Sequence, residues 1–237
     1  MVVAFRQRSA GNKILDFLPR EEFARLVPFL EPVELKSGEI VYLTGDDIQY
    51  AYFPEKGLLS LVSTTEKGST IEVAMVGNEG VVGLPAILRD YKIPYEVTVQ
   101  FTTLALRIKA KALQEEFDKG EALREFVLRY LNVMIAQVSQ AHICTRFHTL
   151  GQTLRRWLLT VQDRVNSDSL ALTHEMIANA LGVPRTAVTK AAGDMQKEGL
   201  IRYSRGKIFI LDRARLEADS CECYHILRDQ LQHFLKK

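Results

Sequence analysis

The sequence predicts an α+β fold, in which an antiparallel β domain is followed by a long helix and a C-terminal winged helix-turn-helix. Three observations predict it. Short stretches of alternating apolar residues occupy residues 33–108, an almost wholly apolar helical stretch follows, and residues 172–211 have the spacing of two helices and a hairpin. The chain has 237 residues, 47% of them apolar, which is enough for more than one folded part. We expect the parts to comprise residues 1–118, 119–148 and 149–237.

The β domain is predicted from the alternation of apolar and polar residues, and from the turns between them, in residues 33–108. A short amphipathic helical segment precedes it at residues 14–30. The stretches that follow alternate between apolar and polar residues, as in Ile71, Val73 and Met75, and glycine-containing turns such as Gly45-Asp46 separate them. This rhythm is typical of an antiparallel sandwich or barrel.

A long helix is predicted over residues 110–147, with a break near residues 119–120. Between residues 126 and 135 only Arg129 and Asn132 are not apolar. A helix that is apolar nearly all round must be covered on more than one side. The β domain can cover one side, and a second copy of the chain is the simplest cover for the other. The alternative is a helix buried within one monomer.

The helix-turn-helix is predicted from the residues that begin, turn and end its two helices. Thr173 is suited to cap the first helix, since its hydroxyl can accept a backbone N–H of the first turn. Gly182 permits the sharp turn and Pro184 suits the start of the second helix. Val188 can fill the space between the helices, and Gly199 ends the second helix near Glu198. Two short strands, 200–203 and 207–211, form the wing.

The second helix offers a polar, basic face suited to the major groove. Arg185, Thr186, Thr189 and Lys190 lie on one side of it. Arginine can bond guanine O6 and N7 together, which discriminates by about 1–3 kcal/mol. Basic residues of the wing are expected to hold phosphates, which set position rather than sequence. The predicted DNA-contacting residues are Thr173, Arg185, Thr186, Thr189, Lys190, Arg202, Ser204, Arg205 and Lys207.

The positively charged residues are in excess in the part of the chain that is predicted to bind DNA. The net charge is only +2, but the residues from Gly151 onward contain 14 Lys and Arg against 10 Asp and Glu, whereas the rest contains 17 against 19. A basic surplus in the helix-turn-helix region favours a nucleic-acid partner. The alternative is a helical hairpin with a solvated basic face.

Several other classes of protein find no support in the sequence. No apolar stretch approaches the about 20 residues of a membrane helix, so we expect a cytoplasmic protein. Three cysteines do not make a disulfide framework. There is no Gly-x-Ser-x-Gly, no Walker loop and no recognisable pair of catalytic carboxylates, so we predict that the protein is not an enzyme.

Cys221 and Cys223 lie close together in a predicted final helix that begins near Asp212. Residues two apart on a helix point about 200° away from each other, which argues against one ion bound by both. Cys221 and His225 share a helix face and could hold a metal with further ligands. We favour small, partly buried thiols, and the five histidines lack zinc-ligand spacing. We therefore predict no metal site and no cofactor.

The order of a β domain, a long helix and a winged helix resembles the Crp/Fnr family of bacterial transcription regulators. The resemblance covers residues 14–211, and its most specific points are Gly38-Glu39, Gly45-Asp46, Gly57 and the helix-turn-helix at 173–199. It implies a β-roll of the jelly-roll, cyclic-nucleotide-binding kind and a homodimer on double-stranded DNA with a two-fold symmetric operator. RNA polymerase is a candidate further partner.

By this resemblance Arg185 and Lys190 match two basic DNA-contacting residues of the cyclic-AMP receptor proteins. Thr186 stands where those proteins have a glutamate, so the preferred half-site should differ. The oxygen sensors of the family hold an iron–sulfur cluster with cysteines mostly near the N-terminus, whereas this chain has no cysteine before Cys144.

The resemblance also implies an effector site in the β-roll, next to the dimer helix. Gly83 keeps the family pattern, but Leu84 replaces the glutamate that binds ribose, and no positive residue stands near 93–94, where the phosphate-binding arginine would fall. A cyclic phosphate buried there would lack a partner, at a cost of several kcal/mol. We predict that cyclic AMP is not the effector and leave its identity open. The candidate pocket residues are Gly83, Leu84, Pro85, Arg89, Val97, Val138 and Ser139.

Two other functions are also compatible with the sequence. One is a ligand-, redox- or metal-sensing module whose helix-turn-helix does not bind DNA, and the other is an enzyme or cofactor-bearing sensor. DNA affinity that falls steeply with salt would separate a phosphate-binding protein from the first rival.

Overall fold

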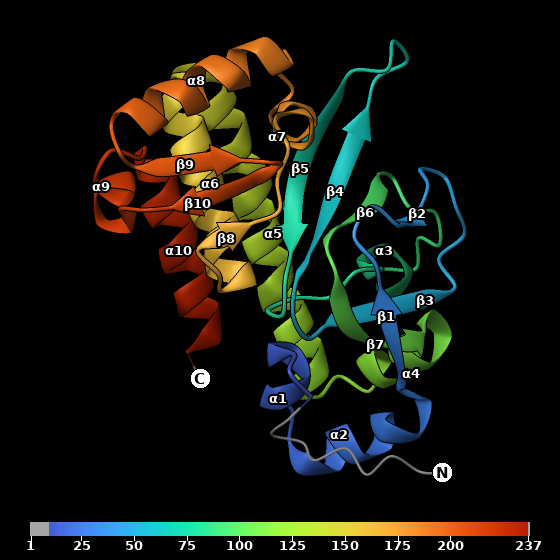
Figure 1. Cartoon of the computed structure of the whole chain (residues 1–237). Coiled ribbons are helices and arrows are strands. Elements are labelled where there is room, and N and C mark those ends of the chain that lie inside the picture. Colours follow the sequence, from blue (N-terminus) through green and yellow to red (C-terminus); the bar gives the residue numbers. More distant parts are fainter. Residues whose placement is uncertain (1–9, 237) are drawn as a thin grey trace. The chain divides into compact units, whose positions relative to one another are not determined.

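The computed structural model describes residues 10–236, and Figure 1 shows the order of their helices and strands. They form two compact units. The first comprises residues 10–61 and 75–132, and the second comprises residues 62–74 and 133–236.

The first unit begins with helical turns, as the amphipathic pattern at 14–30 predicts. They are α1 (Lys13–Phe17), α2 (Arg20–Leu26) and the 3₁₀ turn η2 (Val27–Phe29). Asn12 caps α1, because its side-chain oxygen accepts the N–H of Ile14 and of Leu15. The same side chain donates to the carbonyl oxygens of Pro54 and Gly80, at 3.0 and 2.8 Å. A buried asparagine therefore attaches the first helix to the end of a strand at Pro54 and to the loop at Gly80.

The strands form the antiparallel β domain that the alternation predicts, which confirms the α+β fold class. One sheet has the order β1 (Glu31–Leu35), β7 (Thr103–Lys109), β3 (Tyr50–Pro54). The other has the order β2 (Ile40–Tyr42), β6 (Glu96–Phe101), β4 (Leu58–Thr64), β5 (Thr70–Val76). In the first sheet Phe53 pairs with Leu106, and both side chains are fully buried.

Three helices follow or interrupt the strands. The short α3 (Leu84–Ile87) lies between β5 and β6, α4 (Ala110–Asp118) follows β7, and α5 (Ala122–Phe147) is the longest helix of the described chain. The expected break of the long helix is confirmed at residues 119–121, where Gly120 has φ 79°. Residues of α5 belong to both units.

The second unit holds the helix-turn-helix and its support. Its elements in chain order are α6 (Leu150–Val165), β8 (Ser169–Leu170), α7 (His174–Leu181), α8 (Arg185–Lys197), β9 (Ile201–Ser204) and β10 (Lys207–Ile210). The sequence analysis did not predict β8, which adds a third strand to the wing in the order β8-β10-β9. Thr149 starts α6 with a capping box to Gln152. Trp157 of α6 is buried and donates its indole N–H to Glu72 of β5 at 2.8 Å.

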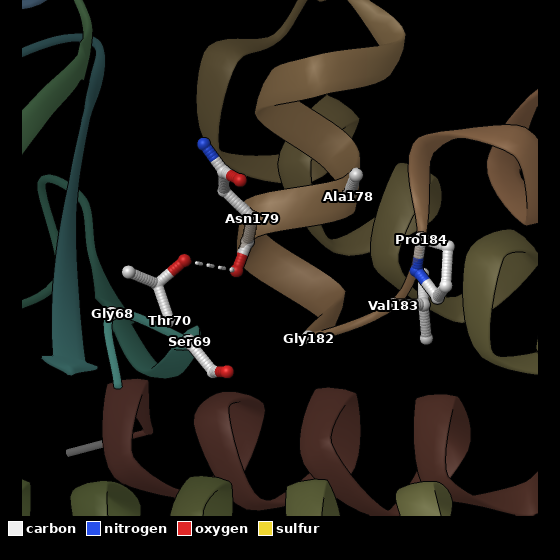
Figure 2. A pocket seen from close by; sticks show the side chains of 8 residues that line it. All are labelled: Gly68, Ser69, Thr70, Ala178, Asn179, Gly182, Val183 and Pro184. Carbon is white, nitrogen blue, oxygen red and sulfur yellow. Dashed lines mark hydrogen bonds between the residues drawn. The ribbon is translucent and has the colours of Figure 1, made fainter. Parts of the chain in front are cut away.

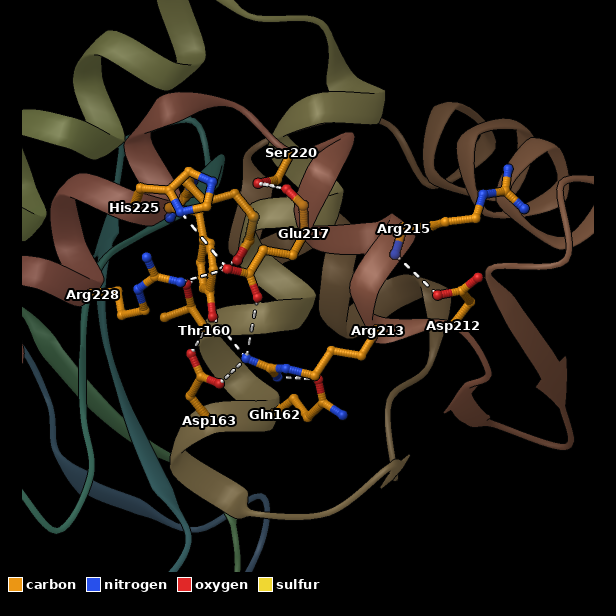
Figure 3. A network of polar contacts seen from close by, with 12 residues as sticks. Thr160, Gln162, Asp163, Asp212, Arg213, Arg215, Glu217, Ser220, His225 and Arg228 are labelled. Carbon is orange, nitrogen blue, oxygen red and sulfur yellow. Dashed lines mark hydrogen bonds and ion pairs between the residues drawn. The ribbon is translucent and has the colours of Figure 1, made fainter.

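The single final helix expected from Asp212 onward is wrong. Asp212 does cap a helix, but this is the short α9 (Arg213–Ala218), and the chain turns at Asp219-Ser220 before α10 (Glu222–Leu235) begins. Figure 3 shows the polar network that fixes this turn. The guanidinium of Arg213 bonds Asp163 of α6 at 2.7 Å and the hydroxyl of Tyr224 at 2.8 Å, and Arg228 pairs with Glu217. These contacts attach α9 and α10 to α6.

Within residues 10–236 no helix combines the length and the apolar character that a membrane span requires.

Candidate DNA-binding site

The turn between α7 and α8 has the construction that the sequence predicts. The hydroxyl of Thr173 accepts the N–H of Met176 at 3.2 Å and so caps α7. Gly182 adopts φ 65° at the end of α7, a left-handed conformation that suits glycine. Val188 is fully buried between the helices, together with Ile177 and Leu181. The packing behind α8 leaves its other side exposed.

The predicted DNA-contacting residues of α8 lie on that exposed side. Arg185 is the first residue of the helix, and 69% of its side chain is exposed. Thr186, Thr189 and Lys190 are exposed as well. Arg185 lies 3.9 Å from the Glu175 carboxylate, and an ion pair so open to solvent is worth little. The guanidinium is therefore available for an acceptor outside the protein.

Thr189, one of the predicted DNA-contacting residues, also forms hydrogen bonds within the protein. The Thr189 hydroxyl donates to the Arg185 carbonyl oxygen at 3.0 Å and lies 2.9 Å from His174 Nδ1. The His174 ring stacks on Tyr203 of β9, with ring centroids 4.0 Å apart. This stack joins α7, α8 and the wing. Sequence reasoning missed His174 and Tyr203, because nothing in the local pattern places a wing residue against the first helix.

The surroundings of His174 favour the neutral form of its ring. Burial lowers the pKa of His174, and the nearby Arg185 guanidinium lowers it further. If Nδ1 donates to Thr189, Nε2 is an acceptor, and Nε2 is buried without a hydrogen-bond partner among the described residues. A proton on Nε2 would then be a buried, unpaired N–H, which is unfavourable.

The wing presents basic side chains around a tight hairpin turn. Lys207 pairs with Ser204, which leaves the two-residue turn Arg205-Gly206 with φ values of 49° and 75°. Two positive φ values define the type I′ turn that suits the twist of a hairpin. Arg202, Ser204, Arg205 and Lys207 are exposed, and the guanidinium of Arg202 lies over the Phe209 ring at 4.5 Å. Thr173 is exposed at the edge of the same surface.

A pocket of about 300 Å³ lies beside the α7–α8 turn, against residues 68–70 (Figure 2). The Thr70 hydroxyl donates to the Asn179 carbonyl oxygen at 3.4 Å. The described residues that line the pocket are small or polar and uncharged, so it offers no cation to a phosphate. They are Gly68, Ser69, Thr70, Ala178, Asn179, Gly182, Val183 and Pro184.

The candidate effector residues are divided between the two units. Gly83 has φ 96°, and a Cβ there would meet the Tyr50 carbonyl oxygen at 3.0 Å, so glycine is required where α3 begins. Leu84 and Val97 are buried as core of the first unit, and Pro85 is half-buried. Arg89 is exposed and pairs with Asp118 at 2.9 Å. Val138 and Ser139 belong to the second unit and are exposed.

Family models match both halves of this architecture. Residues 152–219 match the Crp-like helix-turn-helix domain, and residues 32–119 match the cyclic nucleotide-binding domain.

Two relatives that match most of this chain are named as regulators. The global nitrogen regulator of Synechococcus elongatus is 25% identical over 201 residues, which cover 79% of this chain and 88% of that protein. The transcriptional regulator LdrP of Thermus thermophilus is 27% identical, over 77% of this chain and 93% of that protein.

Solved structures share the fold. FixK2 from Bradyrhizobium japonicum matches with a TM-score of 0.70 at 15% identity, over 81% of this chain and 98% of that one. A CRP-family transcriptional regulator from Thermus thermophilus matches with a TM-score of 0.68 at 24% identity, over 79% and 96%.

Proposed function

Because this chain belongs to the Crp/Fnr family of transcription regulators, we propose that it binds double-stranded DNA as a homodimer on a two-fold symmetric operator. Each α8 contacts one half-site. The observation that carries this proposal is the exposed N-terminal end of α8, where Arg185, Thr186 and Lys190 have no buried role. The N-terminal residues of a recognition helix are those that contact base edges in the major groove.

The residues divide into two chemical roles. Arg185 is assigned to a guanine, because its planar fork matches O6 and N7. Arg202, Arg205 and Lys207 of the wing are assigned to phosphates, which position the protein. Thr189 is assigned a methyl contact, since its hydroxyl already bonds within the protein. Thr173 and Ser204 border the same surface and are assigned to backbone contacts.

Dimerisation is proposed through α5. Leu128, Ile135 and Val138 lie on one side of this helix at positions i, i+7 and i+10, and all three are exposed in the described chain. Apolar residues repeating in this way favour a second helix as their cover. Two copies joined here can place their α8 helices on half-sites one helical turn, about 34 Å, apart.

We propose further that cyclic AMP does not control this protein. The position after Gly83 holds a buried leucine, and Ile93, near the expected phosphate-binding position, is buried and apolar. A cyclic phosphate at this place would be desolvated without a cation. Consistent with the family, we assign the protein a regulatory rather than a catalytic role, in the cytoplasm, with RNA polymerase as a candidate partner.

The test is selection of bound sequences from random DNA, followed by affinity measurements at several salt concentrations. Arg185→Ala should flatten the preference at one base pair per half-site and weaken specific binding by about 1–3 kcal/mol. Arg205→Ala should weaken binding to all sequences alike and reduce the salt slope by about 1.

Arg20→Ala serves as the control, because Arg20 is exposed in α2, in the first unit. It should change neither measurement. DNA affinity that does not depend on salt would instead favour a sensing module whose helix-turn-helix does not bind DNA.

A further inference from the structure

The three cysteines of the chain converge with one histidine in the second unit. Cys144 Sγ lies 3.6 Å from Cys221 Sγ, and Cys223 Sγ lies 3.6 Å from His148 Nδ1. All four of these atoms lie within 4.8 Å of one another. Cys144 and Cys223 are fully buried, Cys221 is 2% exposed, and the His148 side chain is 12% exposed. From these contacts we propose that Cys144, His148, Cys221 and Cys223 form a structural zinc site.

The start of α10 explains how Cys221 and Cys223 can share an ion. Cys221 is the N-cap of α10, with extended backbone at φ −77° and ψ 159°, so it stands outside the helix. The argument that two helical residues point about 200° apart therefore does not apply to this pair. His225, which would share a helix face with Cys221 if both lay within one helix, instead lies 3.8 Å from the Glu217 carboxylate. The histidine in the cluster is His148, one residue past the end of α5.

Two of the ligand separations match those around a single tetrahedral ion, and the others lie within 4.8 Å. Zinc–sulfur bonds of about 2.3 Å place two sulfur ligands about 3.8 Å apart, and a zinc–nitrogen bond of about 2.0–2.1 Å places nitrogen about 3.5 Å from sulfur. The observed separations of 3.6 Å are close to both values. A disulfide needs sulfur atoms about 2.05 Å apart and would leave Cys223 and His148 unused. A cluster of several iron atoms would require ligands spread more widely than these.

The surroundings supply the charge and the orientation that such a site needs. Arg156 of α6 is 7% exposed, and its Nε donates to Cys144 Sγ at 3.3 Å. Three thiolates and Zn²⁺ carry a net charge of −1, which this buried guanidinium balances. His148 Nε2 lies 3.2 Å from the Glu222 carboxylate, which therefore orients the ring through the nitrogen that is not the ligand atom.

The position of the site in the fold assigns it a structural role. Four protein ligands leave no open position for a substrate, as in structural zinc sites. Cys144 and His148 flank the end of α5, and Cys221 and Cys223 begin α10, which the Arg213 and Tyr224 network holds on α6. The ion ties the junction between α5 and α6 to the C-terminal helices.

The first experiment measures metal in the full-length protein, purified without a metal-affinity step. Mass spectrometry of the metals should find one zinc per chain. Exchange with Co²⁺ should produce the strong visible bands of a tetrahedral site and thiolate charge-transfer bands in the near ultraviolet. Removing zinc with a chelator should lower Tm, and adding Zn²⁺ back should restore it. Protein that contains no zinc and gives no cobalt spectrum would overturn the proposal, as would iron with sulfide, or a disulfide between Cys144 and Cys221.

Substitutions then assign the ligands. Cys223→Ser and His148→Gln should each lose the stoichiometric zinc and the cobalt charge-transfer pattern. Glu222→Gln should keep the fold and weaken zinc binding by about 10–100-fold, because it releases the ligand imidazole. His225→Gln, on the same helix but outside the cluster, should keep one zinc per chain. If His148→Gln and Cys223→Ser fold and each still bind one zinc per chain, the assignment of the ligands is wrong. If either of these variants fails to fold, the zinc affinity of Glu222→Gln decides, and an affinity equal to that of the wild type would contradict the proposal.

Discussion

His174 shows how one side chain can hold the DNA-contacting surface together. It bonds Thr189 of α8 through Nδ1 and stacks on Tyr203 of the wing, so it touches both elements that are assigned to DNA. The Gln196 side chain adds a second connection by accepting the N–H of Tyr203 at 2.8 Å. The His174 ring and the Gln196 side chain therefore both connect the wing to α8.

A pH dependence follows at this residue. The pKa of His174 is lowered from 6.5 by burial and by Arg185, so the unfolded chain binds this proton more tightly than the folded one. The stability from the neutral ring is complete above pH 6.5 and is lost as the pH falls through the lower folded pKa. We expect the Tm of the wild type to drop more between pH 7.5 and pH 5 than the Tm of His174→Gln. His233→Gln, at an exposed position of α10, should fall with the wild type, and equal slopes for all three would contradict the role of His174.

Two glycines, one inside α8 and one just after it, differ in the backbone conformation that they require. Gly193 lies inside the helix, and a Cβ there would meet no atom within 4 Å. Gly199 follows the helix with φ 76°, a conformation that other residues adopt only with strain.

Gly193→Ala should therefore stabilise the protein by about 0.5–1 kcal/mol, because it removes the entropic cost of a glycine inside a helix. Gly199→Ala should destabilise it, because alanine is strained at positive φ. Denaturant unfolding of both variants tests the pair. Equal effects in the same direction would show that the end of α8 does not depend on the left-handed residue.

At the scale of the whole molecule, the proposed dimer rests on the exposed apolar side of α5. Ile135 is 64% exposed, and burial of such a side chain is favourable at about 25 cal/mol per Å² of apolar surface. Ile135→Glu should therefore shift the protein from dimer to monomer in analytical ultracentrifugation, by introducing two facing carboxylates.

Phe29→Glu is the matched control, since Phe29 is an exposed apolar residue of the first unit, 56% exposed and outside α5. It should leave the dimer unchanged. A dimer that survives Ile135→Glu but not Phe29→Glu would place the interface elsewhere. Loss of operator affinity together with the dimer would connect the two halves of the proposed function.

Much of the architecture follows from local signals. The break before α5, the Gly182 turn, the buried Val188 and the end of α8 at Gly199 were all predicted, because capping, glycine conformation and helical periodicity act within a few residues. The exposed positions of Arg185 and Lys190 follow from the same periodicity. The strand β8 was missed because two residues carry no periodic signal. The division of the last helix into α9 and α10 was missed because no glycine or proline marks the turn at Asp219-Ser220.

Local patterns in the sequence are enough to predict the α+β class, the order of the parts and the basic face of α8, since each depends on neighbours along the chain. Only the tertiary structure brought Cys144 within 3.6 Å of Cys221, 77 residues away, and placed Tyr203 on His174. Both depend on where a helix begins and which surface it packs against. These two contacts are decided by the packing of α6, α9, α10 and the wing. The periodicity of one segment carries no information about contacts with a distant segment.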